Sequence, residues 1–577
     1  MSRGNTHSRE DDVTERLYDL REEPWIPFRR RSGVVQWGAP WLLTDQLHSD
    51  PIVALAAPRP DFNGALHEFL IGLVSVAMRA QDEEEWQEWW KRPPAPELLR
   101  ERLMALPSAF YLNGDGPRFM QDLRVEDFAK AEPLPIERML IDAPGEQSLD
   151  LNKDVFVKRE RVRVMGAPAA TMALLTLQTY SPAGGRGNLT SLRGGGPLTT
   201  LIVPAPSSEA TNVNSLWAIV WANAETEEQW LSRAVAKSSW KAAELFPWLA
   251  APTTSEGGKT VSLADAHPMQ CYFGVPRRVR LSFGAEDTCD IVGEVSVLSV
   301  TSFQMRPYGA KYESWTHPLS PYYRASKGDA WLPVHGQPGG VGWKDWLALT
   351  LADASAVDRR PAQSVAHFRI RRARHDASTL LRLRAFGYDM DNMKARDWVD
   401  ATLPCPAPDD EHTLQLLRDT STRLVSGTQL ASGLLAGAVE RALFPNPKEA
   451  PGDRAPVKAA LWGEMEQPFY QVIVDVVARG ASVADIDAAC AAFRASLETA
   501  VLDGFDTHVS RVQLLSSHVR RAVAARYGLL AALRGYGKMG NKLFTELRLP
   551  VPESAAPRAK EARGGKKQRT RTGGKAT

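Results

Sequence analysis

The chain has 577 residues, which is too long for one ordinary hydrophobic core, so its length predicts two or more domains. Hydrophobic residues make up 44% of it and charged residues 24%, the composition of a soluble globular protein. The formal net charge is only +2, which excludes a polycation that binds nucleic acid through its overall charge. Any such contact must come from local basic patches or from partner subunits.

The cysteine pattern and the hydropathy argue against several further classes of protein. The four cysteines are scattered without C-x-x-C spacing, which argues against a disulfide framework and against a cysteine zinc site. They are Cys271, Cys289, Cys405 and Cys490. Residues 1–12 lack the apolar core of a signal peptide, and no run reaches the roughly 18 apolar residues that a membrane-spanning helix needs. We therefore expect a soluble cytoplasmic protein that uses no metal ion or other cofactor.

The N-terminal part of the chain is predicted to combine helices and strands. Residues 1–16 are charged and are expected to be disordered, and order begins at Trp25. A helix is predicted over residues 65–79, because apolar residues recur there at the i, i+3, i+4 spacing of a buried face. Those residues are Leu66, Phe69, Leu70, Leu73 and Ala77.

A basic segment lies between residues 142 and 163. Its cationic side chains alternate with valines, which is the period of a strand or an extended loop with one cationic face. The cations assigned to this face are Lys153, Lys158, Arg159 and Arg161. A solvated strand face would explain the pattern, but the closeness of the glycine-rich segment that follows favours a shared phosphate-binding surface.

The segment from Gly184 to Thr200 contains six glycines and two arginines. Glycine can adopt positive φ and lets the backbone approach a ligand closely. Consecutive amide N–H groups in such a loop can form a concave anion site, and arginines add forked positive charge. A flexible connector between two strands is the alternative. The segment is not a P-loop, because no Gly-Lys-Ser/Thr follows it.

Strands are also predicted over residues 271–281 and 290–302, and a mixed basic and aromatic segment follows them. This segment offers two candidate cations, Arg306 and Lys311. His317 could be taken for a general base, but a histidine beside a proline in an aromatic loop is more often structural.

Alternation predicts a further strand over residues 381–386, and residues 387–396 are predicted to form a turn. The turn carries polar, apolar and basic side chains. Taken by itself, the pattern is typical of an ordinary turn that leads into a helix.

A proline-rich stretch, 404–410, marks a domain boundary. Beyond it Leu424, Ala431 and Ala438 repeat at heptad spacing, and four helical patterns with short links predict an antiparallel bundle. The predicted fold class is therefore α+β. The predicted parts are a disordered N-terminus over 1–16, an α+β domain over 17–405, a four-helix bundle over 406–550 and a basic disordered tail over 551–577.

Three segments resemble the CasA family, the large subunit of the type I-E CRISPR surveillance complex Cascade. They are Gly187–Thr200, Trp315–Pro318 and Gly387–Ala395. The resemblance covers roughly Trp25–Leu549 and implies an α+β N-terminal domain followed by a four-helix bundle. It also implies partners: guide RNA, the other Cascade subunits, double-stranded target DNA, and a helicase–nuclease that is recruited once the R-loop has formed. No membrane partner is expected.

The resemblance further implies which residues contact DNA and read its protospacer-adjacent motif, the PAM. The implied groups are a glycine loop of Gly184, Gly185, Arg186, Gly187 and Asn188; a basic finger at Arg306 or Lys311; a wedge of Asn392, Met393, Lys394 and Ala395; and a nucleic-acid-contacting loop with Lys153, Lys158, Arg159 and Arg161. The best-known member of the family uses a glutamine as the wedge, whereas Met393 or Lys394 occupies that place here.

The implied function is recognition of invading DNA through its minor groove, strand opening and recruitment of the nuclease, without catalysis by this chain. The alternative is an enzyme, either a metal-dependent nuclease or a phosphate-ester hydrolase that acts on nucleic acid. Against it, the sequence has no clustered His/Asp/Glu spacing for a metal pair and no nucleophile elbow.

Overall fold

The computed structural model describes residues 16–552, apart from residues 155–158, 186, 205–213, 236, 238, 327, 352–357, 376–380, 392, 407, 409, 447–452, 480–482 and 511–515. The chain divides into two compact units, Met1–Arg418 and Asp419–Thr577, which we call unit 1 and unit 2. Except for Arg16 and residues 551–552, the two ends predicted to be disordered, 1–16 and 551–577, lie outside the described residues.

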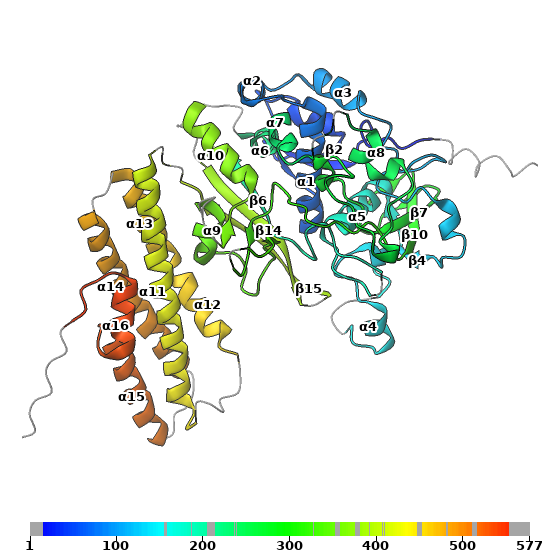
Figure 1. Ribbon diagram of the computed structural model, residues 1–577. Helices are drawn as coiled ribbons and strands as arrows, with labels where there is room; N and C mark the ends of the chain where they lie inside the picture. The colour runs from blue at the N-terminus through cyan, green and yellow to red at the C-terminus, as the bar shows by residue number, and fades with distance from the viewer. Residues whose placement is uncertain are drawn as a thin grey trace, which may run out of the picture. The chain divides into compact units, whose positions relative to one another are not determined.

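Unit 1 is built around helix α1 (Pro60–Met78). Pro60 stands in the first turn, where its missing N–H costs nothing, and the helix ends at Arg79 in the left-handed conformation. Almost every residue of α1 is buried, so the helix is covered on all sides and not only along the predicted face. Phe69 packs edge-on against Trp25 and Phe119, with ring centroids 5.6 and 5.7 Å away. Helix α5 (Ala167–Tyr180) packs against α1 and leads directly into the glycine-rich segment (Figure 1).

Two antiparallel sheets position the segments of interest in unit 1. The first has the order β15–β14–β6, with β6 at Thr199–Pro204, β14 at Leu381–Asp391 and β15 at Lys394–Pro404. The second has β10 (Ser299–Arg306) at its centre, paired with β4 (Leu134–Pro135), β5 (Met165–Gly166) and β7 (Arg278–Gly284).

The sheets correct several sequence-based expectations. The turn predicted over 387–396 is wrong in extent, because residues 387–391 belong to β14 and residues 394–396 to β15. The helix expected after it is wrong, because residues 394–404 form a strand that pairs with β14 in a long hairpin. The strand predicted over 271–281 begins only at Arg278, since residues 268–272 form a 3-10 helix. The strand predicted over 290–302 overlaps β10 only from Ser299 onward, and β10 continues to Arg306; in the described residues 290–298 before it, only the short strand β9 (Val295–Ser296) is present.

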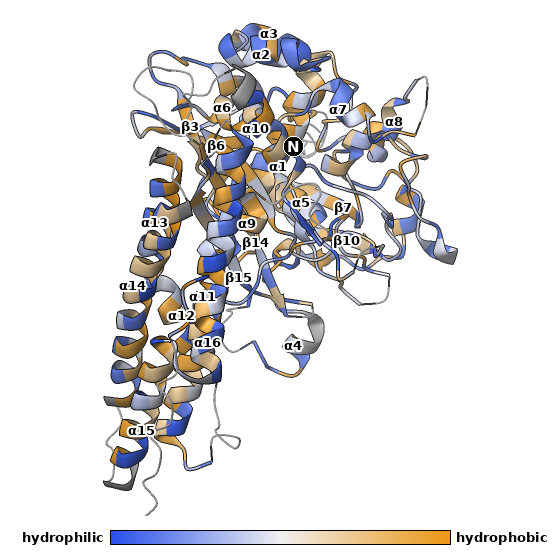
Figure 2. Ribbon diagram, turned by 60° about the vertical axis from the view of Figure 1, so that its left-hand side comes forward, coloured by the Kyte–Doolittle hydropathy of each residue, from blue (hydrophilic) through white to orange (hydrophobic). Residues whose placement is uncertain are grey.

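The remaining elements of unit 1 are short. They are β1 (Ile26–Arg30), β2 (Val35–Gly38), β3 (Ile52–Leu55), α2 (Glu83–Lys91), α3 (Pro96–Met104), α4 (Glu146–Asp150), α6 (Leu216–Ala222), α7 (Glu227–Leu231), α8 (Ala242–Leu245), β8 (Asp287–Thr288), β9 (Val295–Ser296), β11 (Tyr322–Tyr323), β12 (Leu332–Pro333), α9 (Trp346–Thr350), β13 (Arg359–Arg360) and α10 (Gln363–His375). Figure 2 shows hydrophobic residues concentrated on α1 and α5 and hydrophilic residues on α2 and α3.

Unit 2 is helical. Helix α11 (Glu411–Leu443) runs into it from unit 1, and Leu424, Ala431 and Ala438 are fully buried, as the heptad spacing predicts. The other helices are α12 (Ala455–Glu464), α13 (Glu466–Arg479), α14 (Val483–Ser510), α15 (Ser516–Leu533) and α16 (Gly537–Glu546). The short helices α12 and α16 were not among the four expected. The predicted α+β class with a helical C-terminal region is confirmed.

None of the helices in the described part of the chain combines the length and the apolarity needed to span a bilayer.

Candidate nucleic-acid interface

The start of the glycine-rich segment forms a small closed loop just after α5. The Gly184 N–H donates to the Asn188 carbonyl at 3.0 Å, and the Asn188 N–H donates to the Gly185 carbonyl at 3.1 Å. The Asn188 side-chain amide donates to the Gly184 carbonyl at 2.9 Å. Two of the loop amides are therefore used inside the loop, so they are not available to the concave anion site that the sequence suggested. Arg186 lies outside the described residues.

Glycine is required at two positions of this loop. Gly185 and Gly187 have φ of +87° and +80°, a left-handed conformation that other residues rarely adopt. At Gly187 a Cβ would also lie 2.6 Å from the Cβ of Pro307. Gly187 therefore permits both the turn and the close approach of a second segment, which holds the candidate finger.

The finger segment continues strand β10 beyond Arg306. The Tyr308 N–H donates to the Gly187 carbonyl at 2.7 Å, which fixes the glycine loop to the segment that follows β10. Tyr308 itself has φ of +63°, an uncommon value for a residue with a side chain, so the contact is made at a strained turn. The structure thus joins two of the segments that the sequence proposed separately.

The two candidate finger cations differ in environment. Arg306 is half-buried at the end of β10, and its Nε has no hydrogen-bond partner among the described residues. Lys311 is exposed, and its carbonyl accepts the Val261 N–H at 2.7 Å. No contact in the described part of the chain joins Lys311 to the glycine loop, whereas Arg306 directly precedes the residues that touch it.

Arg277 lies behind the glycine loop and was not identified from the sequence. Its Nη1 would lie 3.0 Å from a Cβ placed on Gly184. Its guanidinium donates to the Pro182 carbonyl and, at 3.3 Å, to the Ser181 hydroxyl. Burial lowers the pKa of Arg277 to about 10, and no ion pair with a carboxylate is found for it among the described residues. A buried cation beneath the loop gives that surface a positive potential.

The second half of the glycine-rich segment is held to the core of unit 1 by the buried side chain of Arg193. Arg193 forms an ion pair of 2.5 Å with Glu68 of α1, and its other guanidinium nitrogen donates at 2.9 Å to the hydroxyls of Thr199 and Ser320. Tyr180 donates to the same carboxylate at 2.6 Å. Burial opposes the charged form of Arg193, but Glu68 outweighs it, so the net pKa shift is upward. Loss of one partner from such a buried pair typically costs about 3–5 kcal/mol.

His317 belongs to the same buried region. Its side chain is 1% exposed, its Nδ1 accepts the Leu319 N–H at 3.2 Å, and its Nε2 lies 3.8 Å from Glu68. Burial, and then the nearby Arg193 and Arg233, hold its pKa well below the ordinary value. His317 is therefore a neutral structural residue, as its sequence context indicated.

The glycine-rich segment also packs against the β14–β15 hairpin. Gly196 has φ of +63°, and a Cβ there would lie 2.8 Å from side-chain atoms of Tyr388 and Met390. A Cβ on Gly387 would lie 2.4 Å from the Pro197 carbonyl oxygen. The same glycine-rich segment therefore contacts the finger at its start and the hairpin near its end.

The candidate wedge residues lie at the tip of this hairpin. Asp391 pairs with Lys394, which leaves two residues for the turn. Met393 is 55% exposed, Lys394 is exposed and Ala395 is half-buried. Asn392 lies outside the described residues.

Side-chain contacts close behind the tip hold the hairpin in place. An ion pair of 2.6 Å joins Arg396 to Asp389 across the two strands. Tyr388 donates to Asp61 of α1 at 2.6 Å, and the Trp398 ring packs edge-on against Tyr388 and Tyr180. The tip is thus exposed, while the residues close behind it contact the core of unit 1.

The described residues of the basic segment between residues 142 and 163 do not form the cationic face that the sequence predicted. Residues 146–150 form α4, and residues 159–164 are turns and bends and not a strand with one cationic face. Arg159 forms an ion pair of 2.6 Å with Asp154 and also donates to the Leu149 carbonyl, which uses its charge within the loop. Lys153 and Arg161 are exposed, and Lys158 lies outside the described residues. No described contact joins this loop to the glycine loop.

The described residues contain no group of three or more His, Cys, Asp or Glu side chains placed to hold a metal ion.

Comparisons with known proteins identify the family. The sequence matches the CRISPR-associated protein Cse1 family over residues 19–503, and no curated protein matches it. CasA from Thermus thermophilus is 17% identical and superposes with a TM-score of 0.64. The alignment covers 91% of this chain and 100% of that chain. Cse1 from Thermobifida fusca is 16% identical, with a TM-score of 0.66 and coverages of 93% and 99%. A chain of a CRISPR RNA-guided surveillance complex is 15% identical, with a TM-score of 0.63 and coverages of 89% and 99%.

At these low identities the solved structures establish a shared fold, while the family match extends along most of the chain. The fold class that the resemblance implied is thereby confirmed. This chain belongs to the family of the CRISPR-associated protein Cse1, also called CasA.

Proposed function

We propose that this protein is the large subunit of a CRISPR RNA-guided surveillance complex and that it recognises the PAM of double-stranded DNA through the minor groove. It assembles with guide RNA and the other Cascade subunits and acts by binding, not by catalysis. After recognition it promotes strand opening and R-loop formation and recruits the helicase–nuclease that degrades the DNA. Family membership and the shared fold with a chain of such a complex support this assignment.

The observation that carries the proposal is the hydrogen bond of 2.7 Å between the Tyr308 N–H and the Gly187 carbonyl. It holds a loop with little side-chain bulk beside a segment that starts with a half-buried cation, Arg306. The minor groove is only about 6 Å wide, so it admits backbone and slender side chains more readily than a helix. Its base pattern is degenerate, which suits recognition of several related PAMs, while guide pairing supplies sequence specificity.

The hairpin tip supplies the second step. Side chains inserted between base pairs unstack a step at a cost of a few kcal/mol and occupy the gap that they open. Met393 offers exposed apolar volume and Lys394 offers a positive charge at the end of two paired strands. Gly187 packs against the finger, and Gly196 packs against this hairpin. The glycine-rich segment therefore connects the residues proposed to contact the PAM with those proposed to open the strands.

The test is Gly187→Asp in the complex reconstituted with guide RNA and the other subunits, assayed on duplexes with and without a PAM. The variant places a side chain 2.6 Å from Pro307 at a positive φ and adds a negative charge beside phosphates. We expect the preference for PAM duplexes to fall at least tenfold, roughly the loss of one charge-assisted contact. The matched control is Gly33→Asp, since Gly33 also has positive φ but no atom within 4 Å of its Cβ position.

A folded Gly187→Asp variant that keeps the full PAM preference would contradict the assignment of the glycine loop. Cleavage of DNA by the isolated chain with divalent metal ions would instead support the enzyme alternative.

A further inference from the structure

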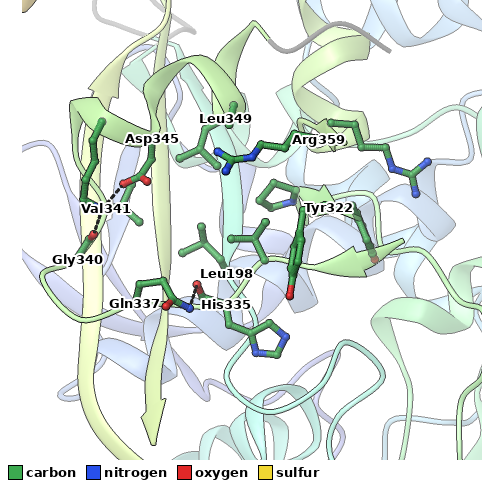
Figure 3. Close-up of a pocket in the computed structure, with 15 residues that line it drawn as sticks. Leu198, Tyr322, His335, Gln337, Gly340, Val341, Asp345, Leu349 and Arg359 are labelled. Atoms are coloured by element: carbon green, nitrogen blue, oxygen red, sulfur yellow. Dashed lines mark hydrogen bonds and ion pairs between the residues drawn. The ribbon is translucent and has the colours of Figure 1, made fainter. Parts of the chain in front are cut away.

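A cavity of about 410 Å³ in unit 1 is lined by none of the residues assigned to the glycine loop, the finger or the wedge. The small sheet of β11, β12 and β13 forms one side of it, and helix α9 with the loop before it forms the other (Figure 3). Leu198, Val341 and Leu349 give it an apolar floor. Pockets that bind small molecules typically measure roughly 300–1,000 Å³, so this cavity suits a ligand at the small end of that range.

Two neighbouring arginines, Arg359 and Arg360, line the cavity. No hydrogen bond or ion pair of either side chain is found in the part of the chain that the structure describes. Arg359 is exposed, and Arg360 is half-buried, with its guanidinium 5.0 Å from the Tyr322 ring and 4.5 Å from the Trp331 ring. The Arg324 guanidinium lies 4.5 Å from the same Trp331 ring, so two cations share one aromatic side chain. The charges of Arg359 and Arg360 therefore lack a matching carboxylate among the described residues.

Two buried arginines of unit 1 do have carboxylate partners: Arg193 is paired with Glu68, and Arg233 with Glu225. The carboxylate that lines the cavity, Asp345, is already used, because it accepts Lys344 at 2.9 Å and the Gly342 N–H at 3.2 Å. Figure 3 shows the labelled Asp345 directed toward this neighbouring contact. An anion from outside the chain would supply the charge that Arg359 and Arg360 lack.

The walls of the cavity also carry aromatic and apolar side chains, which could contact a larger ligand than an anion alone. Tyr322 and Tyr323 line the cavity beside apolar side chains, and Tyr323 pairs across the strands with Arg359. Aromatic rings stack on nucleobases, and guanidinium groups bind phosphate through paired N–H donors. We propose that this cavity is a nucleotide-binding site, with a phosphate held by Arg359 and Arg360 and the base packed on the tyrosine and apolar walls.

The nucleotide has two possible sources, a free mononucleotide or the terminal unit of a nucleic-acid strand. Both present the same phosphate and base. The site adjoins the glycine-rich segment without being part of the loop assigned to DNA: the Leu198 N–H donates to the Val334 carbonyl at 2.9 Å, and His335 bonds the Gly195 carbonyl at 2.8 Å. The inference goes beyond the proposed function, because no PAM-reading step requires this cavity.

The test is calorimetric titration of the full-length chain with AMP, adenosine and inorganic phosphate. We expect saturable AMP binding that is tighter than binding of either fragment. Arg359→Gln combined with Arg360→Gln removes the phosphate donors and should weaken AMP binding at least tenfold, roughly the effect of a lost charge-assisted hydrogen bond. Ala348→Phe fills the cavity while keeping both arginines, and it should weaken AMP binding as well.

The control variant is Arg29→Gln combined with Arg31→Gln, which makes the same change in charge at two exposed positions and should bind AMP normally. If the arginine variant does not fold, the Ala348→Phe variant decides the question. Competition of AMP by a 5′-phosphorylated dinucleotide would support a strand as the source, and failure to compete would support a free nucleotide. Absence of AMP binding by the natural chain, or unchanged binding by both folded cavity variants, would overturn the proposal.

Discussion

Arg277 shows how a single buried residue can set the charge of a surface loop. Its guanidinium reaches the backbone at Pro182 and lies beneath Gly184, and burial lowers its pKa to about 10. An arginine with that pKa stays protonated below about pH 9, so its charge is constant across the range in which proteins are usually handled. The proposed attraction between the loop and phosphate therefore does not vary with pH in the natural chain.

Arg277→Lys should make that attraction depend on pH. Lysine has an ordinary pKa of about 10.4, and burial lowers the pKa of a lysine by as much as 3–5 units. The pKa of the introduced amine should thus lie at roughly 5.4–7.4, so the amine should be charged below about pH 5 and neutral near pH 9. We expect the affinity of the assembled complex for PAM duplex to fall as pH rises through roughly 5–8 in the variant only.

The measurement is the dissociation constant of PAM duplex at a series of pH values and constant ionic strength. Arg100→Lys is the control, because Arg100 is exposed and lies outside the site. A loss of affinity that is the same at every pH would mean that Arg277 only shapes the loop.

At the scale of elements, the β14–β15 hairpin shows what sequence patterns can and cannot predict. Alternation located the start of β14, but the expected helix was wrong because β15 contains a bulge. Asp389 pairs with Asp397 while Met390 pairs with Ala395, so Arg396 is an extra residue that interrupts the period of two. Pairing of the two strands is a long-range effect, which a local pattern does not contain.

The proposed wedge makes a prediction for this element. Met393→Gly combined with Lys394→Gly removes side-chain volume and one charge at the tip and leaves the base of the hairpin intact. R-loop yield on relaxed, fully paired DNA should fall, because unstacking a base step costs a few kcal/mol and nothing then fills the gap. A duplex pre-melted beside the PAM, or negatively supercoiled DNA, should restore the yield.

The control for the wedge is Val34→Gly combined with Val35→Gly, since these exposed valines lie at the β1–β2 turn. It should form R-loops normally on both substrates. An equal defect of the wedge variant on paired and pre-melted duplexes would assign Met393 and Lys394 to docking or folding.

At the scale of the whole molecule, sequence patterns located the segments of the candidate interface but not the contacts between them. The glycine-rich segment, the finger and the hairpin were each visible as local patterns. Their association was not visible, because Gly187 meets Tyr308 and Arg193 meets Glu68 across more than one hundred residues of chain. Arg277 was missed because it lies within the strand predicted over 271–281, where a single buried cation leaves no periodic signal.

The charge of the whole molecule leads to the last prediction. With a net charge of only +2, overall attraction to DNA is weak, so the salt dependence of binding should reflect local contacts. Each phosphate contact contributes a slope of about 0.9 in log affinity against log salt. Arg306→Gln combined with Lys311→Gln should therefore reduce the slope by about one to two units and lower the affinity at low salt.

The comparison requires a variant with the same net charge and a different location. Lys91→Gln combined with Arg102→Gln also removes two charges, from exposed positions on α2 and α3, which Figures 1 and 2 place at the end of unit 1 away from the β14–β15 tip. Because both variants carry the same net charge, a difference in slope isolates the position of the lost charges. The measurement is duplex affinity of the assembled complex across a salt series. Equal slopes for the two variants would place the DNA-contacting cations elsewhere, whereas a slope reduced only by the Arg306 and Lys311 changes would locate them beside the glycine loop.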